Sequence, residues 1–121
     1  MEYYNKKFVG CDMHKRYSVF VSTDSKGNYS LPVKVVHHRE FIKNFLLNFP
    51  SQSQIAIESV GNWYWLVDEI ESAGHLPLLA HARRAKMMMV QPNKTDKLDA
   101  KGLAKLLLNK TLPTVSSKTS S

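Results

Sequence analysis

The sequence contains a single cysteine, Cys11, and no long apolar segment. One cysteine excludes an intramolecular disulfide, and within an apolar strand it is most simply a small core residue. No apolar run approaches the ~18 residues that a membrane-spanning helix needs. The N-terminus (Met-Glu-Tyr-Tyr-Asn) lacks the pattern of a signal peptide, so secretion is not expected. These absences indicate a globular protein of the cytoplasm without membrane segments.

Acidic residues are also scarce, because ten Asp and Glu stand against seventeen Lys and Arg, which gives a net charge of +7. If four of the acids form one site, the seventeen basic residues face only six acids elsewhere. Such a surface favours a polyanionic partner, although a solvated basic surface without a partner has the same composition.

The hydrophobic pattern changes along the chain from strand-like to helix-like spacing. A turn-forming segment at 24–28 predicts an antiparallel meander in the first part of the chain. The expected strands are 8–13, 17–23, 31–36, 54–58 and 76–80. The expected helices are 38–49, one capped by Asn62 and running to Ala73, 82–90, and one capped by Thr95 and running to about Asn109.

This order, a meander followed by alternating helices and strands, matches a ribonuclease H-like α/β architecture with a mixed central sheet and flanking helices. We predict one domain over residues 1–110. Residues 111–121 are rich in Ser, Thr and Lys and are expected to be a flexible tail or a truncated linker.

Four acids lie at the ends of predicted strands or at the start of a predicted helix. Asp12 and Glu58 each end an apolar strand, and Asp96 and Asp99 are spaced i, i+3 at the start of the last helix. Carboxylates gathered at one point repel each other unless a divalent cation neutralises them. Oxygen ligands without a Cys/His cluster favour Mg²⁺ or Mn²⁺, and two such ions can catalyse phosphodiester chemistry.

Each of these residues also has a simpler interpretation. Asp96 and Asp99 would complement a helix dipole, Glu58 could be a solvated strand end, and Asp12 could be a turn residue. His14 shares the strand face of Asp12, where it could touch metal or phosphate or serve as polar packing. The segment Asn62-Trp-Tyr-Trp65 could stack on bases, or its two tryptophans could anchor the core.

The basic residues around the last two helices are candidate contacts to nucleic acid phosphates, and an exposed helix face is the alternative. The candidates are Lys15, Arg83, Arg84, Lys86, Lys94, Lys97, Lys101 and Lys105.

Three motifs together resemble the N-terminal, RuvC-like domain of the DEDD transposases, the insertion-sequence recombinases of the IS110 group that are related to the Piv invertase. The motifs are Val9-Gly-Cys-Asp-Met-His-Lys15, Ile55-Ala-Ile-Glu-Ser-Val-Gly-Asn-Trp-Tyr-Trp65 and Lys94-Thr-Asp-Lys-Leu-Asp-Ala-Lys101. Carried over by motif, the resemblance implies that Asp12, Glu58, Asp96 and Asp99 are the catalytic, metal-binding acidic tetrad.

The resemblance further implies a DNA partner, in some members a structured guide RNA, and a nucleoid-associated bacterial protein that forms homo-oligomers. Similar full-length proteins continue into a second domain with a nucleophilic serine. The C-terminal serines here match no such motif, so we expect a truncated product or an excised domain with an incomplete active site.

Two rival functions remain open at the level of sequence. A free-standing RuvC-like nuclease or junction resolvase would cleave branched DNA by itself. A non-catalytic nucleic-acid-binding remnant of a decayed element would bind with a steep salt dependence and would not need the acids.

Overall fold

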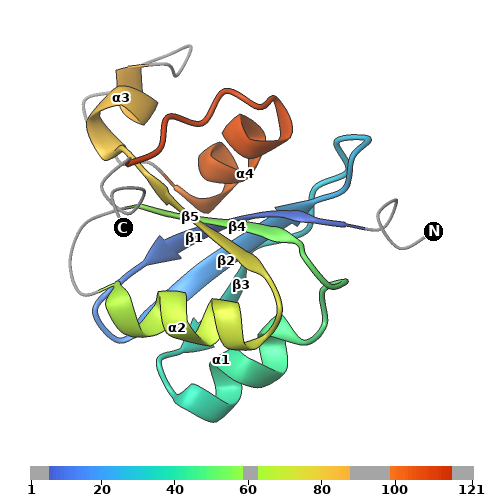
Figure 1. The fold of residues 1–121 in the computed structure, drawn as a ribbon, viewed down its shortest axis with the longest axis vertical. Helices are drawn as coiled ribbons and strands as arrows, with labels where there is room; N and C mark the ends of the chain where they lie inside the picture. The colour runs from blue at the N-terminus through green and yellow to red at the C-terminus, as the bar shows by residue number, and fades with distance from the viewer. Residues whose placement is uncertain (1–5, 59–62, 88–98, 116–121) are drawn as a thin grey trace.

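The chain forms a five-stranded mixed sheet with helices on both faces (Figure 1). This computed structural model describes residues 6–58, 63–87 and 99–115. The strands are β1 (Phe8–Met13), β2 (Tyr17–Thr23), β3 (Val33–Val36), β4 (Gln54–Glu58) and β5 (Leu76–Ala80). Their spatial order is β3-β2-β1-β4-β5, in which the first three form the predicted antiparallel meander and β4 and β5 continue parallel to β1. The predicted ribonuclease H-like α/β fold is therefore confirmed.

Helices cover the two faces of the sheet unequally, as Figure 1 shows. One face carries α4 (Ala100–Leu108), and the other carries α1 (Arg39–Leu46) and α2 (Tyr64–Ser72), while α3 (Ala82–Met87) follows the end of β5. No helix in the described part of the chain is long and apolar enough to cross a membrane.

Alternation along the strands creates a separate core on each face. On β1, Val9 and Cys11 point toward α1 and α2, where they join a cluster of large aliphatic and aromatic side chains. On the α4 face the strands contribute small residues, Ala56 and Ala80, which pack against Leu103 and other residues of α4. Small side chains under α4 let that helix approach the sheet closely.

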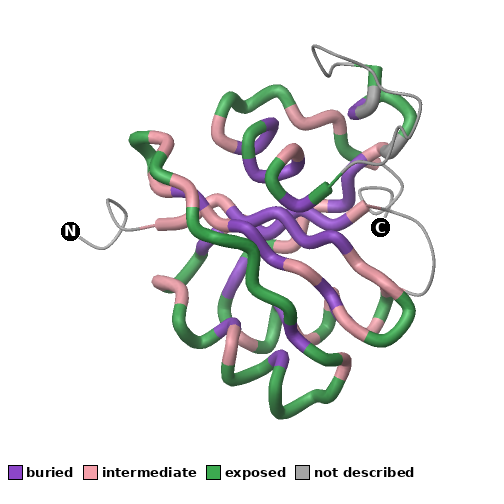
Figure 2. Tube along the Cα trace, turned by 180° about the vertical axis from the view of Figure 1, so that it is seen from behind, coloured by how far each residue is buried: buried purple, intermediate pink, exposed green. Residues whose placement is uncertain are grey.

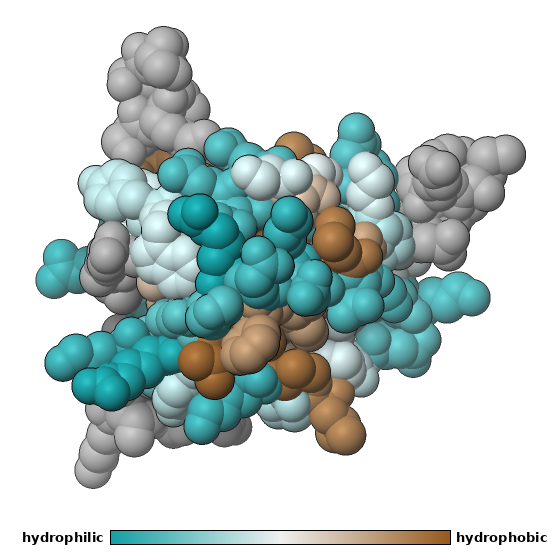
Figure 3. Space-filling model, turned by 90° about the horizontal axis from the view of Figure 1, so that it is seen from below, coloured by the Kyte–Doolittle hydropathy of each residue, from teal (hydrophilic) through white to brown (hydrophobic). Residues whose placement is uncertain are grey.

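Burial along the chain follows this arrangement (Figure 2). The central strands β1 and β4 are nearly continuously buried, whereas β3 at the edge is mostly exposed. Figure 3 views the molecule from below, onto the face that α1 and α2 cover, and shows a mainly hydrophilic surface broken by a few hydrophobic groups. Phe41 of α1 and Leu47, which follows its last residue, are exposed apolar residues.

The helix ends differ in detail from the sequence expectations. The helix expected over 38–49 ends at Leu46, and the following residues form a tighter last turn in which Asn48 and Phe49 donate to carbonyls three residues back. Asn62 lies outside the described residues; Trp63 precedes α2 without capping it through its side chain. The N-cap position falls on Trp63, so α2 begins one residue later than a cap at Asn62 predicts.

The last helix begins several residues later than the sequence predicts. The helix expected from a Thr95 cap begins at Ala100, and Asp99 is its N-cap, with an extended backbone and with Oδ1 accepting from the Gly102 N–H at 2.8 Å. Asp99 therefore precedes this helix, whereas the i, i+3 spacing had predicted that it lies inside the helix; Asp96 lies outside the described residues. The physical reason is that an Asp side chain satisfies an orphan N–H of the first turn best from the N-cap position.

Gly10 is the point at which α4 meets the sheet. A Cβ built on Gly10 would lie 1.9 Å from the carbonyl oxygen of Ala100 and 2.8 Å from the backbone nitrogen of Ala104. Both neighbours are helix backbone, so no side-chain rotation could relieve the clash. Glycine at this position is therefore a requirement of the close contact between α4 and β1.

The segment that follows α4 returns along the outer edge of β5. The His81 N–H donates to the Pro113 carbonyl at 2.8 Å, the Val115 N–H donates to the Leu79 carbonyl at 2.9 Å, and Thr114 pairs with Ala80. Part of the stretch expected to be a tail is thus hydrogen-bonded to the sheet. The domain boundary at residue 110 stays a prediction.

Replacing Gly10 should separate the helix from the sheet. We expect Gly10→Ala to lower the free energy of unfolding by about 3 kcal/mol or more, because overpacking against backbone cannot relax locally. Urea denaturation followed by circular dichroism measures this. Gly74→Ala is the control, since Gly74 has φ of 86° and an added Cβ would meet only Ser51 Oγ, at an ordinary contact distance of 3.9 Å. This variant should lower the free energy of unfolding by only about 1 kcal/mol. Equal decreases in the two variants would contradict the role of close approach.

The capping role of Asp99 gives a second test of stability. We expect Asp99→Ala to lower the free energy of unfolding by about 1 kcal/mol and Asp99→Asn to change it by only a few tenths, because Asn caps as well as Asp. Thermal or urea unfolding distinguishes the two variants. Asp68→Ala, at a position of α2 away from both caps, should be nearly neutral. A decrease in stability in Asp99→Asn as large as in Asp99→Ala would show that charge, not capping, is what matters.

Candidate functional site

Asp12 and Glu58 lie at the same end and on the same face of the sheet. In the parallel pairing of β1 with β4, Cys11 is opposite Ile57, and Asp12 and Glu58 are the next residue of each strand. Gly10 and Ala56, two residues earlier, both contact α4 or its core cluster, so alternation directs both acids to the α4 face. The sequence prediction that these two acids occupy neighbouring strands is therefore confirmed.

Asp99 lies over the same region of the sheet. It directly precedes Ala100, whose carbonyl oxygen sits against Gly10, and Gly10 is two residues before Asp12 on β1. The Leu108 end of α4 lies by Gly27, in the loop that follows β2, so α4 runs from the end of β1 near Asp12 toward the opposite end of the sheet. The N-terminal end of α4 is thus the end nearer to the two strand acids.

The fourth acid, Asp96, lies outside the described residues. Within residues 6–58, 63–87 and 99–115, no three His, Cys, Asp or Glu side chains lie close enough together to hold a metal ion. The structure thus brings three acids to one end of one sheet face without placing their side chains around a common point.

His14 holds the Asp12 side chain. Its Nε2 lies 3.0 Å from Asp12 Oδ2, and its ring stacks on Tyr17 with 4.6 Å between the centroids. Asp12 is only 9% exposed, so this contact fixes one carboxylate oxygen at the edge of the core. The sequence prediction that His14 shares the face of Asp12 agrees with this contact.

Cys11, beside Asp12, faces the opposite side of the sheet. Burial raises the pKa of its thiol to about 12, with a hydrogen bond from Ser18 opposing and the Asp12 charge adding to the rise. The thiol therefore stays protonated at neutral pH. Cys11 is a core residue, as its apolar strand predicted, and offers no nucleophile.

The basic residues predicted to contact nucleic acid are exposed wherever the structure describes their side chains. On α4, Lys101 and Lys105 point to solvent, and the Lys101 Nζ lies 5.2 Å from the centroid of the Tyr29 ring. Lys15, Arg83 and Arg84 are also exposed. Lys94 and Lys97 lie outside the described residues, as does the side chain of Lys86.

The three aromatic residues at the start of α2 divide between core and surface. Trp63 and Trp65 are partly buried and pack against the large core cluster, whereas Tyr64 is 66% exposed. The core interpretation thus fits Trp63 and Trp65, and the surface interpretation fits Tyr64.

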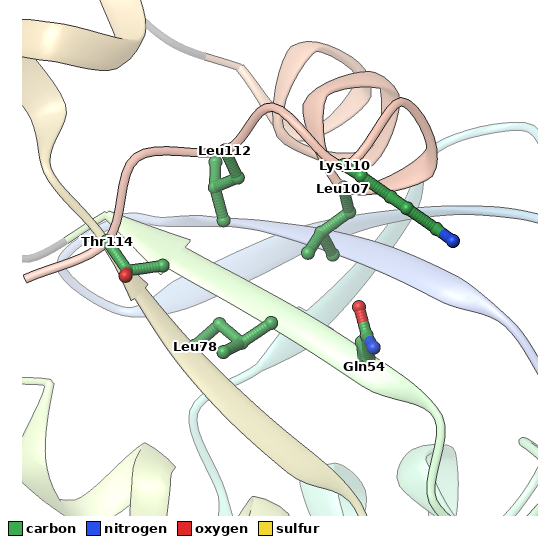
Figure 4. Close-up of a pocket in the computed structure, with 6 residues that line it drawn as sticks. All are labelled: Gln54, Leu78, Leu107, Lys110, Leu112 and Thr114. Atoms are coloured by element: carbon green, nitrogen blue, oxygen red, sulfur yellow. The ribbon is translucent and has the colours of Figure 1, made fainter.

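A pocket of about 210 Å³ lies elsewhere on the α4 face (Figure 4). Leu78, Leu107 and Leu112 form its apolar wall, and Gln54, Lys110 and Thr114 complete it. The lining runs along β4 and β5, from Gln54 at the start of β4 to Thr114, which bridges Ala80, the residue paired with Glu58. None of its lining residues is acidic, and it forms no part of the candidate site.

Sequence reasoning did not single out two residues near the site. Gly10 was not singled out, although an isolated glycine in an apolar strand is a known sign of close backbone approach. Arg16 was also missed, since it belongs to no motif; it lies exposed in the turn between β1 and β2, beside Lys15.

The comparison with known protein families agrees with this architecture. A family model described as a transposase, the IS110-type DEDD transposase model, matches residues 9–121. No curated protein matches the chain. The match covers all the described strands and helices apart from the first residue of β1, and family membership implies a protein that acts on DNA. The chain belongs to the DEDD transposase family of the IS110 type.

Proposed function

We propose that this domain supplies an acidic, metal-binding tetrad, formed by Asp12, Glu58, Asp96 and Asp99, for DNA strand cleavage and rejoining during transposition. One observation carries the proposal: the parallel pairing of β1 with β4 sets Asp12 beside Glu58 on the face that the Asp99 end of α4 covers. The simpler roles of these acids, as a helix cap or a strand end, do not require three separate elements to bring them to the same end of one sheet face.

The chemistry of these donors fits Mg²⁺ or Mn²⁺. The described acids offer only carboxylate oxygens toward this face, and Cys11, the single thiol of the chain, points into the opposite core. Hard oxygen donors without thiolate are the set that Mg²⁺ and Mn²⁺ prefer. When bound, such ions would activate the attacking oxygen and stabilise the leaving oxygen of the phosphodiester.

The protein's own residues hold the carboxylates in position. His14 contacts Asp12 Oδ2 at 3.0 Å, which orients that side chain at the end of β1. Gly102 donates its N–H to Asp99 Oδ1 at 2.8 Å, which fixes the direction of the Asp99 carboxylate. Since a carboxylate has two oxygens, capping with one is compatible with binding a cation through the other.

The exposed lysines of α4 would hold the DNA backbone. Lys101 and Lys105 follow Asp99 along α4, so a strand lying on this helix would have its phosphates near the acids. A DNA substrate would also place the protein on the nucleoid. A structured guide RNA, a second domain with a serine nucleophile and homo-oligomeric assembly stay predictions from the family resemblance.

Metal binding tests the acidic site directly. We expect calorimetric titration to show that the protein binds Mn²⁺. Asp12→Asn, Glu58→Gln and Asp99→Asn should each lower the affinity for Mn²⁺ by roughly tenfold or more, because mutating even the partners of metal ligands lowers metal affinity by about ten- to hundredfold. Asp99→Asn is informative because Asn retains the helix cap.

The control for this titration is Glu71→Gln, an exposed carboxylate near the far end of α2. It should leave the affinity for Mn²⁺ unchanged. If the three site variants bind Mn²⁺ as tightly as the unaltered protein, the acids do not form a metal site.

The salt dependence of DNA binding tests the lysines. For duplex DNA, the slope of log K against log salt concentration should fall by about 0.9 for each phosphate that a variant no longer neutralises. We expect this decrease in Lys101→Ala and Lys105→Ala, measured by fluorescence anisotropy over a range of salt. Lys43→Ala, on α1 across the sheet, should leave the slope unchanged. If Lys101→Ala and Lys105→Ala both keep the slope of the unaltered protein, α4 does not contact the DNA backbone.

A further inference from the structure

Trp63 and Tyr64 form a stacked pair of rings at the start of α2. Their centroids are 4.0 Å apart and their planes differ by 26°. Trp63 packs against the large core cluster, whereas Tyr64 is 66% exposed. The inner ring is therefore held by the core, and it holds the outer ring in a defined position at the surface.

This aromatic pair lies at the end of the sheet that carries the acids. β4 ends at Glu58, and Trp63 follows five residues later, so the two lie at most about 18 Å apart along an extended chain. The start of α2 is also tied to the turn between β1 and β2. The His37 N–H donates to the Arg16 carbonyl at 2.9 Å, and the His37 ring lies 5.0 Å from the ring of Trp65.

The turn that His37 joins to α2 is basic. Lys15 and Arg16 are both exposed, and in Figure 1 this turn passes beside the first turn of α2. His37 itself is fixed by a 2.7 Å contact between its Nε2 and Ser18 Oγ, and burial lowers its pKa, so it adds no charge at neutral pH. An exposed ring and two cations therefore occur together at the end of the sheet that carries the acids, although α2 covers the face opposite to the one toward which Asp12 and Glu58 point.

We propose that the Trp63–Tyr64 pair binds an unpaired base of a single DNA strand, with Lys15 and Arg16 contacting its phosphates. The inference rests on the proposed function, since it states that the DNA at the acidic site is single-stranded where it contacts the protein. Bases stack on exposed aromatic rings irrespective of sequence, and cations beside the rings bind the backbone. A fully paired duplex keeps its bases stacked on each other, so it cannot use the Tyr64 ring.

The test compares a single-stranded oligodeoxynucleotide with a blunt duplex of the same sequence. We expect Tyr64→Ala to weaken binding of the single strand by about tenfold, within the range for removal of one stacking ring, and to leave duplex binding unchanged. Tyr64→Phe keeps the ring and should bind like the unaltered protein. Lys15→Ala and Arg16→Ala should instead lower the salt slope by about 0.7 for each phosphate of the single strand that is no longer neutralised.

Leu47→Ala is the matched control, because Leu47 is 59% exposed and lies at the opposite end of α1 from this turn. It should leave binding of both probes unchanged. Circular dichroism spectra establish that each variant is folded, and the high exposure of Tyr64 makes a folding defect unexpected.

Several outcomes would overturn the proposal. An unchanged affinity of Tyr64→Ala for the single strand would do so, as would an equal weakening for single strand and duplex. A same-sequence RNA strand that binds more than tenfold tighter than DNA would overturn the assignment to DNA. Each of these results is distinguishable from failure of the proposed function, which the Mn²⁺ titration and the α4 lysine variants measure independently.

Discussion

The contact between the α4 backbone and Gly10 is the constraint on which the rest of the structure depends. A Cβ on residue 10 would lie 1.9 Å from the Ala100 carbonyl oxygen, so no residue with a side chain fits at this position. The fully buried strand residues in the core under α4 include the alanines Ala56 and Ala80, which suits this close approach. The N-terminal end of α4 lies on the side of the acids at the ends of β1 and β4. The absence of a side chain at Gly10 thus affects both the packing of α4 and the geometry of the candidate site.

Much of the fold was predictable from the sequence because it rests on local patterns. The bounds of β1, β2, β4 and β5 agree with the predicted strands, since the central strands β1 and β4 are mostly apolar and β2 is rich in β-branched and aromatic residues. The neighbouring positions of Asp12 and Glu58 followed from the order of the elements, because that order matches the ribonuclease H-like architecture, in which the strand after the meander pairs with the first strand. These features need no knowledge of individual contacts.

The start of α4 was harder to predict because two positions competed for the cap. Thr95 and Asp99 are both good N-cap residues, and the acid spacing favoured a helix that includes both aspartates. Tertiary contact at Gly10 decides where this helix meets the sheet, and periodicity carries no information about it. The division of Trp63, Tyr64 and Trp65 between core and surface likewise depends on how α2 is rotated against the sheet.

The segment that follows α4 has a consequence for the outer edge of β5. An uncovered edge strand offers a row of N–H and C=O groups to which another chain can pair. Here residues 113–115 occupy part of that row through bonds to Leu79 and His81. Pro113 accepts a bond through its carbonyl but has no N–H to donate on its other side. The Ala80 end of this edge is therefore covered by a segment that is itself poorly suited to recruit a further strand, which reduces the length of β5 open to edge-to-edge pairing.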